Sequence, residues 1–278
     1  MIEVRGLSFT YAGSAEPALR DIDLEIPASQ LCAVVGANGA GKSSLCHALT
    51  GFIPHFYRGA LAGRVHVAGH NVPETSLADL AGDVGLVFQN PFNQITGARF
   101  TVLEEVAFGL ENLGLPRAEM LDRCLEALAL TGLESVADRS PYQLSGGQQQ
   151  RLAVASMLAM KPKVLVLDEP TSQLDPAGTE AIFAHLQQLS SRGEMTIVLT
   201  EHKLEWVASF APRVVLLSGG RIVADGPPRQ VLASEALEAN GVLPTRCTQA
   251  ARQLRSLGLA SRDRPLPVTV EQTAEYLR

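Results

Sequence analysis

One glycine-rich segment constrains the fold of this chain more than any other: Gly36-Ala37-Asn38-Gly39-Ala40-Gly41-Lys42-Ser43. Its spacing is G-x-x-x-x-G-K-S, and it lies between an apolar run at 31–35 and a segment at 44–49 that can open a helix. The glycines let successive backbone N–H groups turn toward one point, and the helix N-terminus adds partial positive charge there. Strand, glycine loop and helix together predict a binding site for phosphate groups.

The residue types in this segment suggest a role for each side chain. Lys42 is placed to reach the β- and γ-phosphates of a nucleotide, and the Ser43 hydroxyl is placed to bind Mg²⁺. A glycine-rich turn without a ligand is the alternative, but the complete spacing in its strand–helix context favours nucleotide binding. The candidate nucleotide-binding residues of this segment are Gly36, Asn38, Gly39, Gly41, Lys42, Ser43 and Ser44.

Length and charge limit the classes of protein that fit. The 278 residues suffice for one large α/β domain with an appendage, or for two small domains. The net charge of −6 argues against an extended nucleic-acid surface, although a local basic patch stays open. No C-x-x-C pair occurs, so we expect buried, reduced thiols in a reducing compartment. The four cysteines are Cys32, Cys46, Cys124 and Cys247.

Nothing in the sequence predicts a segment that spans or enters a membrane. No apolar run approaches the roughly 20 residues that a membrane-spanning helix needs. The first five residues lack the charged-then-apolar layout of a secretion signal. We therefore expect a cytosolic protein, in which any work at a membrane is done through a partner.

Periodicity predicts an α/β fold with a parallel core sheet. Residues 1–30 read as antiparallel β-structure, and 20–26 alternates polar and apolar residues. Tyr11 is expected in a loop between the first strands, where the pattern alone favours packing on the sheet at least as much as stacking on a ligand. The expected later strands are 63–69, 83–88, 163–168 and 195–200, followed by a hairpin of 213–217 with 221–224.

An all-helical insert, at about 90–162, interrupts the alternation of strands and helices. Helical spacing places Val102, Val106, Leu110 and Leu113 on one face, and Leu121, Leu125 and Leu128 on a face of the next helix. Residues 114–116, Gly-Leu-Pro, separate these two helices. Another helix is expected to run from about Gln148 to Met160, and one more over 177–191.

The chain changes character after residue 235, so we divide it into a domain of 1–235 and a C-terminal helical extension of 236–278. One expected helix carries Ala250, Leu254 and Leu257, and Thr269 with Gln272 forms a plausible capping box for the last helix. A flexible tail without fixed structure is the alternative. The apolar spacing slightly favours an appendage that docks on the domain or forms a dimer.

Two acidic residues, Asp168 and Glu169, end a buried strand downstream of the glycine loop. Phosphoryl transfer needs mainly positioning and charge neutralisation. Asp168 can hold the waters around Mg²⁺, and Glu169 can orient and deprotonate the attacking water. Two solvated acids at a strand end are the alternative, but the glycine loop is expected on the same parallel sheet, which favours a catalytic pair.

A second anion-binding helix start follows Leu144-Ser145-Gly146-Gly147-Gln148. A single γ-phosphate does not require two such anion-binding helix starts from the same molecule. A second copy arranged head-to-tail could supply this one, so we expect ATP to be held between two protomers.

With these motifs the chain resembles the ATP-binding cassette family over about residues 1–235. The string at 144–148 is that family's signature, and the other motifs follow in the family's order. The resemblance implies that Tyr11 stacks on adenine, that Gln89 senses the γ-phosphate and Mg²⁺ and faces a transmembrane partner, and that His202 contacts the γ-phosphate. It also implies that residues 172–175 cross the dimer interface.

The candidate residues fall into three sets. The catalytic set is Glu169, His202 and Gln89. The ATP-binding set is Tyr11, the seven residues of the glycine segment named above, Ser145, Gly147 and Gln148. The Mg²⁺ set is Ser43, Gln89 and Asp168. The other five histidines have no spacing typical of metal ligands and are assigned no site: His47, His55, His66, His70 and His185.

A narrower resemblance is to the cassettes of energy-coupling factor importers, which serve vitamins and transition-metal ions. It rests on residues 53–59, 88–94 and 106–112, and on the C-terminal extension from Pro244 to Leu277. Phe92 stands where many members carry an acidic residue, on the surface that meets the membrane coupling protein. The resemblance implies a peripheral ATPase on the cytoplasmic face of the membrane. Its expected partners are a second cassette, identical or paralogous, a membrane coupling protein and a substrate-binding membrane component.

The main alternative is a soluble cassette ATPase of DNA repair, chromosome organisation or translation. Repair and chromosome members carry long coiled-coil insertions, whereas here only about 100 residues without sustained heptads separate the two anion-binding motifs. Translation members usually carry two cassettes and basic linkers, whereas this chain is acidic. A P-loop kinase or GTPase would not explain the Ser145 signature. The sequence therefore favours a transport ATPase.

Overall fold

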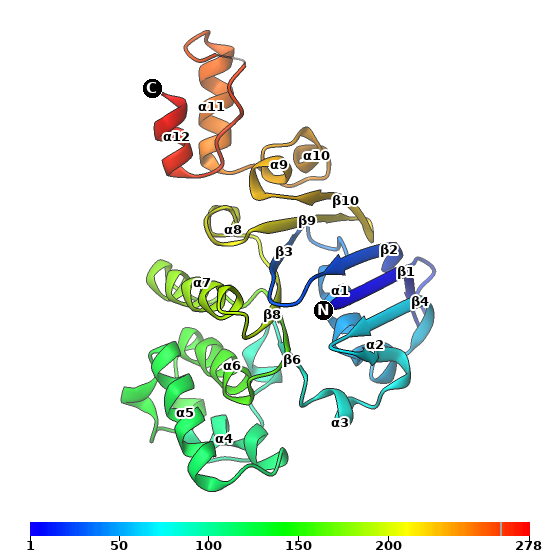
Figure 1. The fold of residues 1–278 in the computed structure, drawn as a ribbon, viewed down its shortest axis with the longest axis vertical. Coiled ribbons are helices and arrows are strands. Elements are labelled where there is room, and N and C mark those ends of the chain that lie inside the picture. The colour runs from blue at the N-terminus through cyan, green and yellow to red at the C-terminus, as the bar shows by residue number, and fades with distance from the viewer. Residues whose placement is uncertain (262) are drawn as a thin grey trace.

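Six strands form the larger of two β-sheets in the structure, a computed structural model that describes residues 1–261 and 263–278 (Figure 1). Their order is β10-β9-β3-β8-β7-β6. Strands β9, β3, β8, β7 and β6 are parallel, and β10 is antiparallel to β9. The bounds are β3 Leu31–Val35, β6 Val84–Val87, β7 Val164–Asp168, β8 Thr196–Thr200, β9 Arg213–Ser218 and β10 Arg221–Gly226. The predicted α/β fold with a parallel core sheet is confirmed.

The smaller sheet is antiparallel and has the order β2-β1-β4-β5. Its bounds are β1 Ile2–Tyr11, β2 Leu19–Ile26, β4 Gly59–Val67 and β5 His70–Asn71. Tyr11 is the last residue of β1, so its expected place in a loop is wrong; it pairs with Gly59 of β4. Helix α1 (Lys42–Leu49) contacts both sheets, β4 of the smaller and β7 and β8 of the larger, and the short helices α2 (Phe52–His55) and α3 (Leu77–Leu80) follow it.

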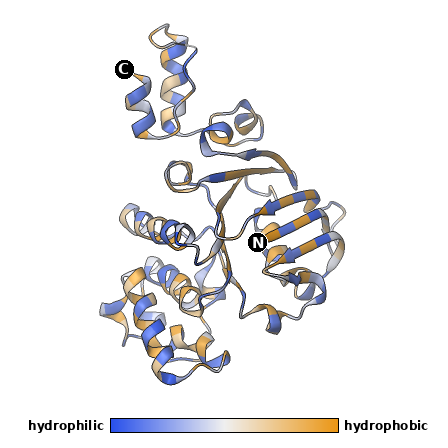
Figure 2. Ribbon diagram, viewed as in Figure 1, coloured by the Kyte–Doolittle hydropathy of each residue, from blue (hydrophilic) through white to orange (hydrophobic). Residues whose placement is uncertain are grey.

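The core strands are apolar on both faces because each face meets a separate hydrophobic cluster. In β7, Val164 and Val166 face the cluster between the two sheets, whereas Leu165 and Leu167 face the cluster under the helices on the other side. Figure 2 shows the hydrophobic colour concentrated on these strands and on alternate positions of the smaller sheet. A parallel strand covered on both faces needs an unbroken apolar run, which is the pattern seen in the sequence.

The helical insert consists of α4 (Val102–Asn112), α5 (Arg117–Thr131) and α6 (Gly146–Met160). Short 3-10 turns lie at Val72–Glu74, Pro91–Asn93, Glu134–Val136 and Pro141–Gln143. Of the predicted apolar faces, Val102, Val106, Leu110 and Leu128 are buried, but Leu113, Leu121 and Leu125 are exposed. The buried stripe of α5 consists instead of Cys124, Ala127, Leu128 and Thr131. Three of these four side chains are small or polar, which periodicity in large apolar residues could not reveal.

The C-terminal extension is folded and docked on the domain. Helices α7 (Pro176–Ser191), α8 (Leu204–Phe210), α9 (Pro228–Leu232) and α10 (Glu235–Ala239) precede α11 (Arg246–Ser256) and α12 (Val270–Tyr276). Val268 is buried in the same hydrophobic cluster as Val231 and Leu237. The Arg229 guanidinium donates hydrogen bonds to the carbonyls of Leu266 and Pro265, both at 2.9 Å. These contacts place the segment 265–268 against α9 and α10.

The details of the extension differ from the expectation at two places. On α11 the buried residues are Thr248 and Ala251, while Ala250 and Leu257 are exposed. Thr269 caps α12 through the N–H of Gln272, but the Gln272 amide oxygen accepts from Val268, one residue before the cap. None of the described helices is long and apolar enough to span a membrane.

Candidate active site

The register of the parallel strands brings three loops to one edge of the sheet. Thr200, the last residue of β8, lies opposite Val34 of β3 on one side and Asp168 of β7 on the other. The glycine loop follows β3, Glu169 follows β7 and His202 follows β8. Ligands of open parallel sheets bind where such strand ends meet, so this edge is the candidate site.

Two glycines of the loop lie where no side chain fits. A Cβ on Gly36 would lie 2.3 Å from the carbonyl oxygen of Leu217, and one on Gly41 would lie 2.7 Å from that of Ala18. Gly41 also has φ +105°, a conformation that other residues rarely adopt. The loop is thus pressed against neighbouring backbone, and α1 begins directly after it at Lys42.

Lys42 is buried at the centre of the site. Its Nζ lies 3.0 Å from the carbonyl oxygen of Gly36, 3.2 Å from that of Ala37 and 3.2 Å from Nε2 of His202. Burial lowers the pKa of the Lys42 ammonium, and the negative charges of Glu169 and Asp168 oppose that effect. Among the described residues its hydrogen-bond acceptors are the two neutral carbonyl groups, so an anionic ligand would stabilise this cation.

The Glu169 carboxylate is held by residues from two other loops. Nε2 of Gln89 donates to Oε2 at 2.8 Å, and Nε2 of His202 lies 2.8 Å from Oε1. One nitrogen cannot both donate to Glu169 and accept from Lys42; the carboxylate is the stronger partner, which favours the tautomer with a proton on Nε2. The Glu169 backbone has φ +49°, unusual for a residue with a side chain. The structure therefore brings together Gln89, Glu169, His202 and Lys42.

Thr200 is a site residue that the sequence reasoning missed. Its hydroxyl donates to Oδ1 of Asp168 at 2.6 Å and accepts from the backbone N–H of Glu169 at 3.0 Å. It thereby fixes the strand end that carries both acids. The signal in the sequence was a polar residue ending the apolar strand at 195–200, but its partner became visible only with the register.

Tyr11 and Ser44 meet at the side of the site. The Tyr11 hydroxyl lies 3.0 Å from Oγ of Ser44, and its ring packs edge-on against Phe9 and Tyr57. Burial raises the pKa of Tyr11, and the hydrogen bond with Ser44 partly offsets this. Tyr11 therefore packs on the smaller sheet, and its role toward adenine stays a prediction. Asn38 and Gly39 are exposed at the tip of the loop, and Ser43 is half-buried.

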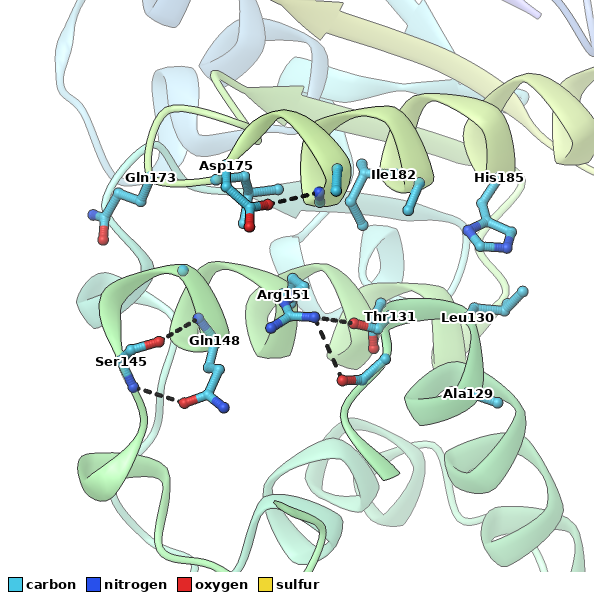
Figure 3. Close-up of a pocket in the computed structure, with 16 residues that line it drawn as sticks. Ala129, Leu130, Thr131, Ser145, Gln148, Arg151, Gln173, Asp175, Ile182 and His185 are labelled. Carbon is cyan, nitrogen blue, oxygen red and sulfur yellow. Dashed lines mark hydrogen bonds between the residues drawn. The ribbon is translucent and has the colours of Figure 1, made fainter. Parts of the chain in front are cut away.

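The signature residues lie in a different place. Ser145 caps α6: its hydroxyl accepts from the N–H of Gln148, whose side-chain oxygen accepts from the N–H of Ser145 (Figure 3). These residues and Gly147 line an open cleft of about 580 Å³ between α6, the end of α5 and the start of α7. Among the described residues, none of the glycine loop lines this cleft.

Comparison with known proteins identifies the family. The family model for ABC transporters matches residues 19–172. A putative ABC transporter ATP-binding protein of Pyrococcus abyssi is 45% identical over 264 residues, covering 94% of this chain and 93% of the relative. The energy-coupling factor transporter ATP-binding protein EcfA1 of Lacticaseibacillus paracasei is 40% identical over 233 residues, covering 84% and 81%.

Solved structures agree with these relatives. The structure of cbiO1 from Clostridium perfringens, part of the ABC transporter complex cbiONQ, matches with a TM-score of 0.74 and 30% identity, covering 92% of this chain and 96% of that one. The dimeric ATP-binding cassette MJ0796 with bound ADP and Pi matches with a TM-score of 0.73 and 27% identity, covering 82% and 99%. The chain belongs to the ABC transporter family and is an ATPase of that family.

Proposed function

We propose that this chain is the ATP-hydrolysing subunit of an energy-coupling factor importer for a vitamin or a transition-metal ion. The observation that carries the catalytic part is that Ser145 lines a cleft to which the described residues of the Lys42 loop contribute nothing, which leaves two anion-binding elements for one triphosphate. A second cassette placed head-to-tail would complete each site. The dimeric cassette MJ0796, with ADP and Pi, supports this arrangement.

The chain's own residues divide the work of hydrolysis between them. Lys42 donates to the carbonyl oxygens of Gly36 and Ala37 and exchanges these neutral acceptors for the β- and γ-phosphates when ATP binds. Glu169 is aimed by Gln89 and His202, and it accepts the proton of the attacking water. His202 lies beside both Lys42 and Glu169, and its Nε2–H donates a hydrogen bond to the γ-phosphate. Tyr11 offers its ring to adenine.

The oxygen atoms at the site fit a magnesium ion. Ser43 offers a hydroxyl and Asp168 a carboxylate, while Gln89 uses its amide nitrogen on Glu169 and keeps its amide oxygen for a cation. Few protein ligands suffice, because Mg²⁺ keeps several waters and phosphate oxygens in its octahedral shell. When bound, the ion neutralises charge on the phosphates.

The finer assignment rests on the named relatives and on one feature of this chain. EcfA1 is an ATP-binding protein of an energy-coupling factor transporter, and cbiO1 is part of an ABC transporter complex. The extension at α11 and α12, which packs on the chain through Val268, is the proposed second surface for pairing. We propose that the protein is peripheral, on the cytoplasmic face, with a second cassette, a membrane coupling protein and a substrate-binding membrane component as partners.

Co-purification tests this proposal. The tagged chain would be isolated from gently solubilised membranes of its native host, and its partners identified by mass spectrometry. We expect a second cassette, an integral membrane scaffold and a small membrane protein that binds the cargo. Recovery in the soluble fraction with nucleic acid or ribosomes would contradict the importer and favour the soluble alternative.

A further inference from the structure

Glu201, which precedes His202, has a buried carboxylate that is hydrogen-bonded to two loops. It is only 3% exposed. Its Oε2 accepts from the backbone N–H groups of His202 and Lys203, at 2.9 and 3.1 Å, and its Oε1 accepts from the Thr171 hydroxyl. A buried carboxylate costs free energy unless hydrogen bonds compensate it, and here all the compensation comes from the segments 171–174 and 201–203.

Lys203, which follows His202, also connects the segment 201–203 to the turn 171–174, here as a hydrogen-bond donor. Its Nζ donates to the carbonyl oxygens of Thr171 and Leu174, at 2.7 and 3.3 Å, and lies 3.1 Å from the hydroxyl of Thr179 in α7. An ammonium has three donors, and these contacts use all of them. The N–H of Leu174 also bonds the Thr171 carbonyl, so Lys203 holds both ends of one turn.

The two hydrogen-bonded segments, 171–174 and 201–203, have different surroundings. His202 faces the phosphate site, where it contacts Lys42 and Glu169. Residues 172 and 173 are exposed, and Asp175 beyond them caps α7. Gln173 also touches the signature: a Cβ on Gly146 would lie 2.4 Å from its amide oxygen. The turn 171–174 is thus fastened to His202 on its inner side and lies against the start of α6 on its outer side.

We propose that Glu201 and Lys203 are positioning residues that make the turn 171–174 and His202 shift as one body. Contact of that turn with a second cassette then sets the geometry of His202 against Glu169, and hydrolysis depends on docking. This inference rests on the proposed head-to-tail dimer. Neither residue touches the phosphate site, so their effect is on the rate of the chemical step rather than on ATP affinity.

Two substitutions in the full-length protein test this role: Lys203→Met, which keeps the aliphatic stem, and Thr171→Val, which removes only the hydroxyl. We expect kcat for ATP to fall at least about tenfold in each, with the Kd for ATP within about twofold of wild type. Because both act on one network, the double variant should be close to the worse single variant. Thr171→Ser should restore kcat, and Lys203→Arg should restore it in part.

The matched control is Lys161→Met, on a surface lysine paired with Glu126, which should keep the wild-type kcat. A wild-type kcat in Lys203→Met and Thr171→Val would overturn the inference. Parallel losses of kcat, ATP affinity and melting temperature, without rescue by Thr171→Ser, would also overturn it, because they indicate a purely structural role. Glu169→Gln distinguishes failure of this inference from failure of the proposed function. If Glu169→Gln still hydrolyses ATP, the proposed function fails. If Glu169→Gln is inactive while Lys203→Met has the wild-type kcat, only this inference is rejected.

Discussion

Nε2 of His202 lies 2.8 Å from Oε1 of Glu169, and the two residues follow neighbouring parallel strands. Gln89 holds the other oxygen of the same carboxylate at 2.8 Å. Both oxygens of the Glu169 carboxylate are therefore held by residues from two other loops. These bonds also stabilise the positive φ of Glu169, a conformation that costs about 1 kcal/mol or more on its own.

Glu169→Gln should retain ATP binding and lose turnover by a factor of about 10² or more, because an amide cannot accept the proton of the attacking water. The ATP-bound variant should accumulate as a closed dimer. Phosphate release and analytical ultracentrifugation with ATP measure the two effects, with Glu180→Gln on the exposed face of α7 as control. Undiminished hydrolysis would remove the role assigned to Glu169.

Lys42→Ala should weaken ATP binding at least about tenfold, because a charge-assisted contact with the phosphates is lost. Titration calorimetry with ATP measures the dissociation constant, and Lys161→Ala is the control. An unchanged constant would contradict the phosphate cradle.

Gly36→Ala should abolish ATP binding and lower the melting temperature strongly, because its Cβ would meet the Leu217 carbonyl oxygen at 2.3 Å. Gly39→Ala is the matched variant: its φ is +77°, but no atom lies within 4 Å of its Cβ, so it should cost only about 1 kcal/mol. Equal stabilities of the two variants would show that contact with Leu217 does not restrict the loop.

Asp83 gives the protein a pH-dependent contribution to stability. Hydrogen bonds from His70, the larger effect, and from Lys163 lower the pKa of the Asp83 carboxyl below its ordinary 3.8. The stabilisation is therefore present above about pH 4 and is lost as the pH falls through the lowered pKa. Asp83→Asn should cost about 0.5–1 kcal/mol at pH 7, and the difference should vanish near pH 2. A difference that persists in acid would point to another cause.

Cutting the chain after residue 240 should loosen the pairing of cassettes, because exposed apolar side chains, Leu257 and Leu277, directly follow α11 and α12. Removal also takes Val268 out of the core, so a second variant is needed. Leu257→Gln with Leu277→Gln keeps Val268 in place and removes only the exposed apolar surface. Sedimentation in the presence of ATP gives the dimer dissociation constants. If both shortened and substituted proteins associate as tightly as wild type, the extension has no part in pairing.

The sequence by itself determined the local chemistry: the glycine loop, the buried strands, the acidic pair and the capped start of α6. These are properties of contiguous residues, since backbone conformation, apolar runs and helix caps are set within a few positions. Even so, two helix faces were placed wrongly. The α5 stripe consists of Cys124, Ala127, Leu128 and Thr131, and close packing of helices selects such small side chains where a count of leucines selects others.

Only the tertiary structure decided which distant residues meet. The pairing of Asp168 with Thr200 follows from the register of two parallel strands, and the contact of Lys203 with Thr171 follows from the turn after one of them. Such contacts join residues about 30 positions apart, and no local pattern encodes them. The sequence named the chemical groups of the site, while the long-range packing of β3, β7 and β8 set their order and distances.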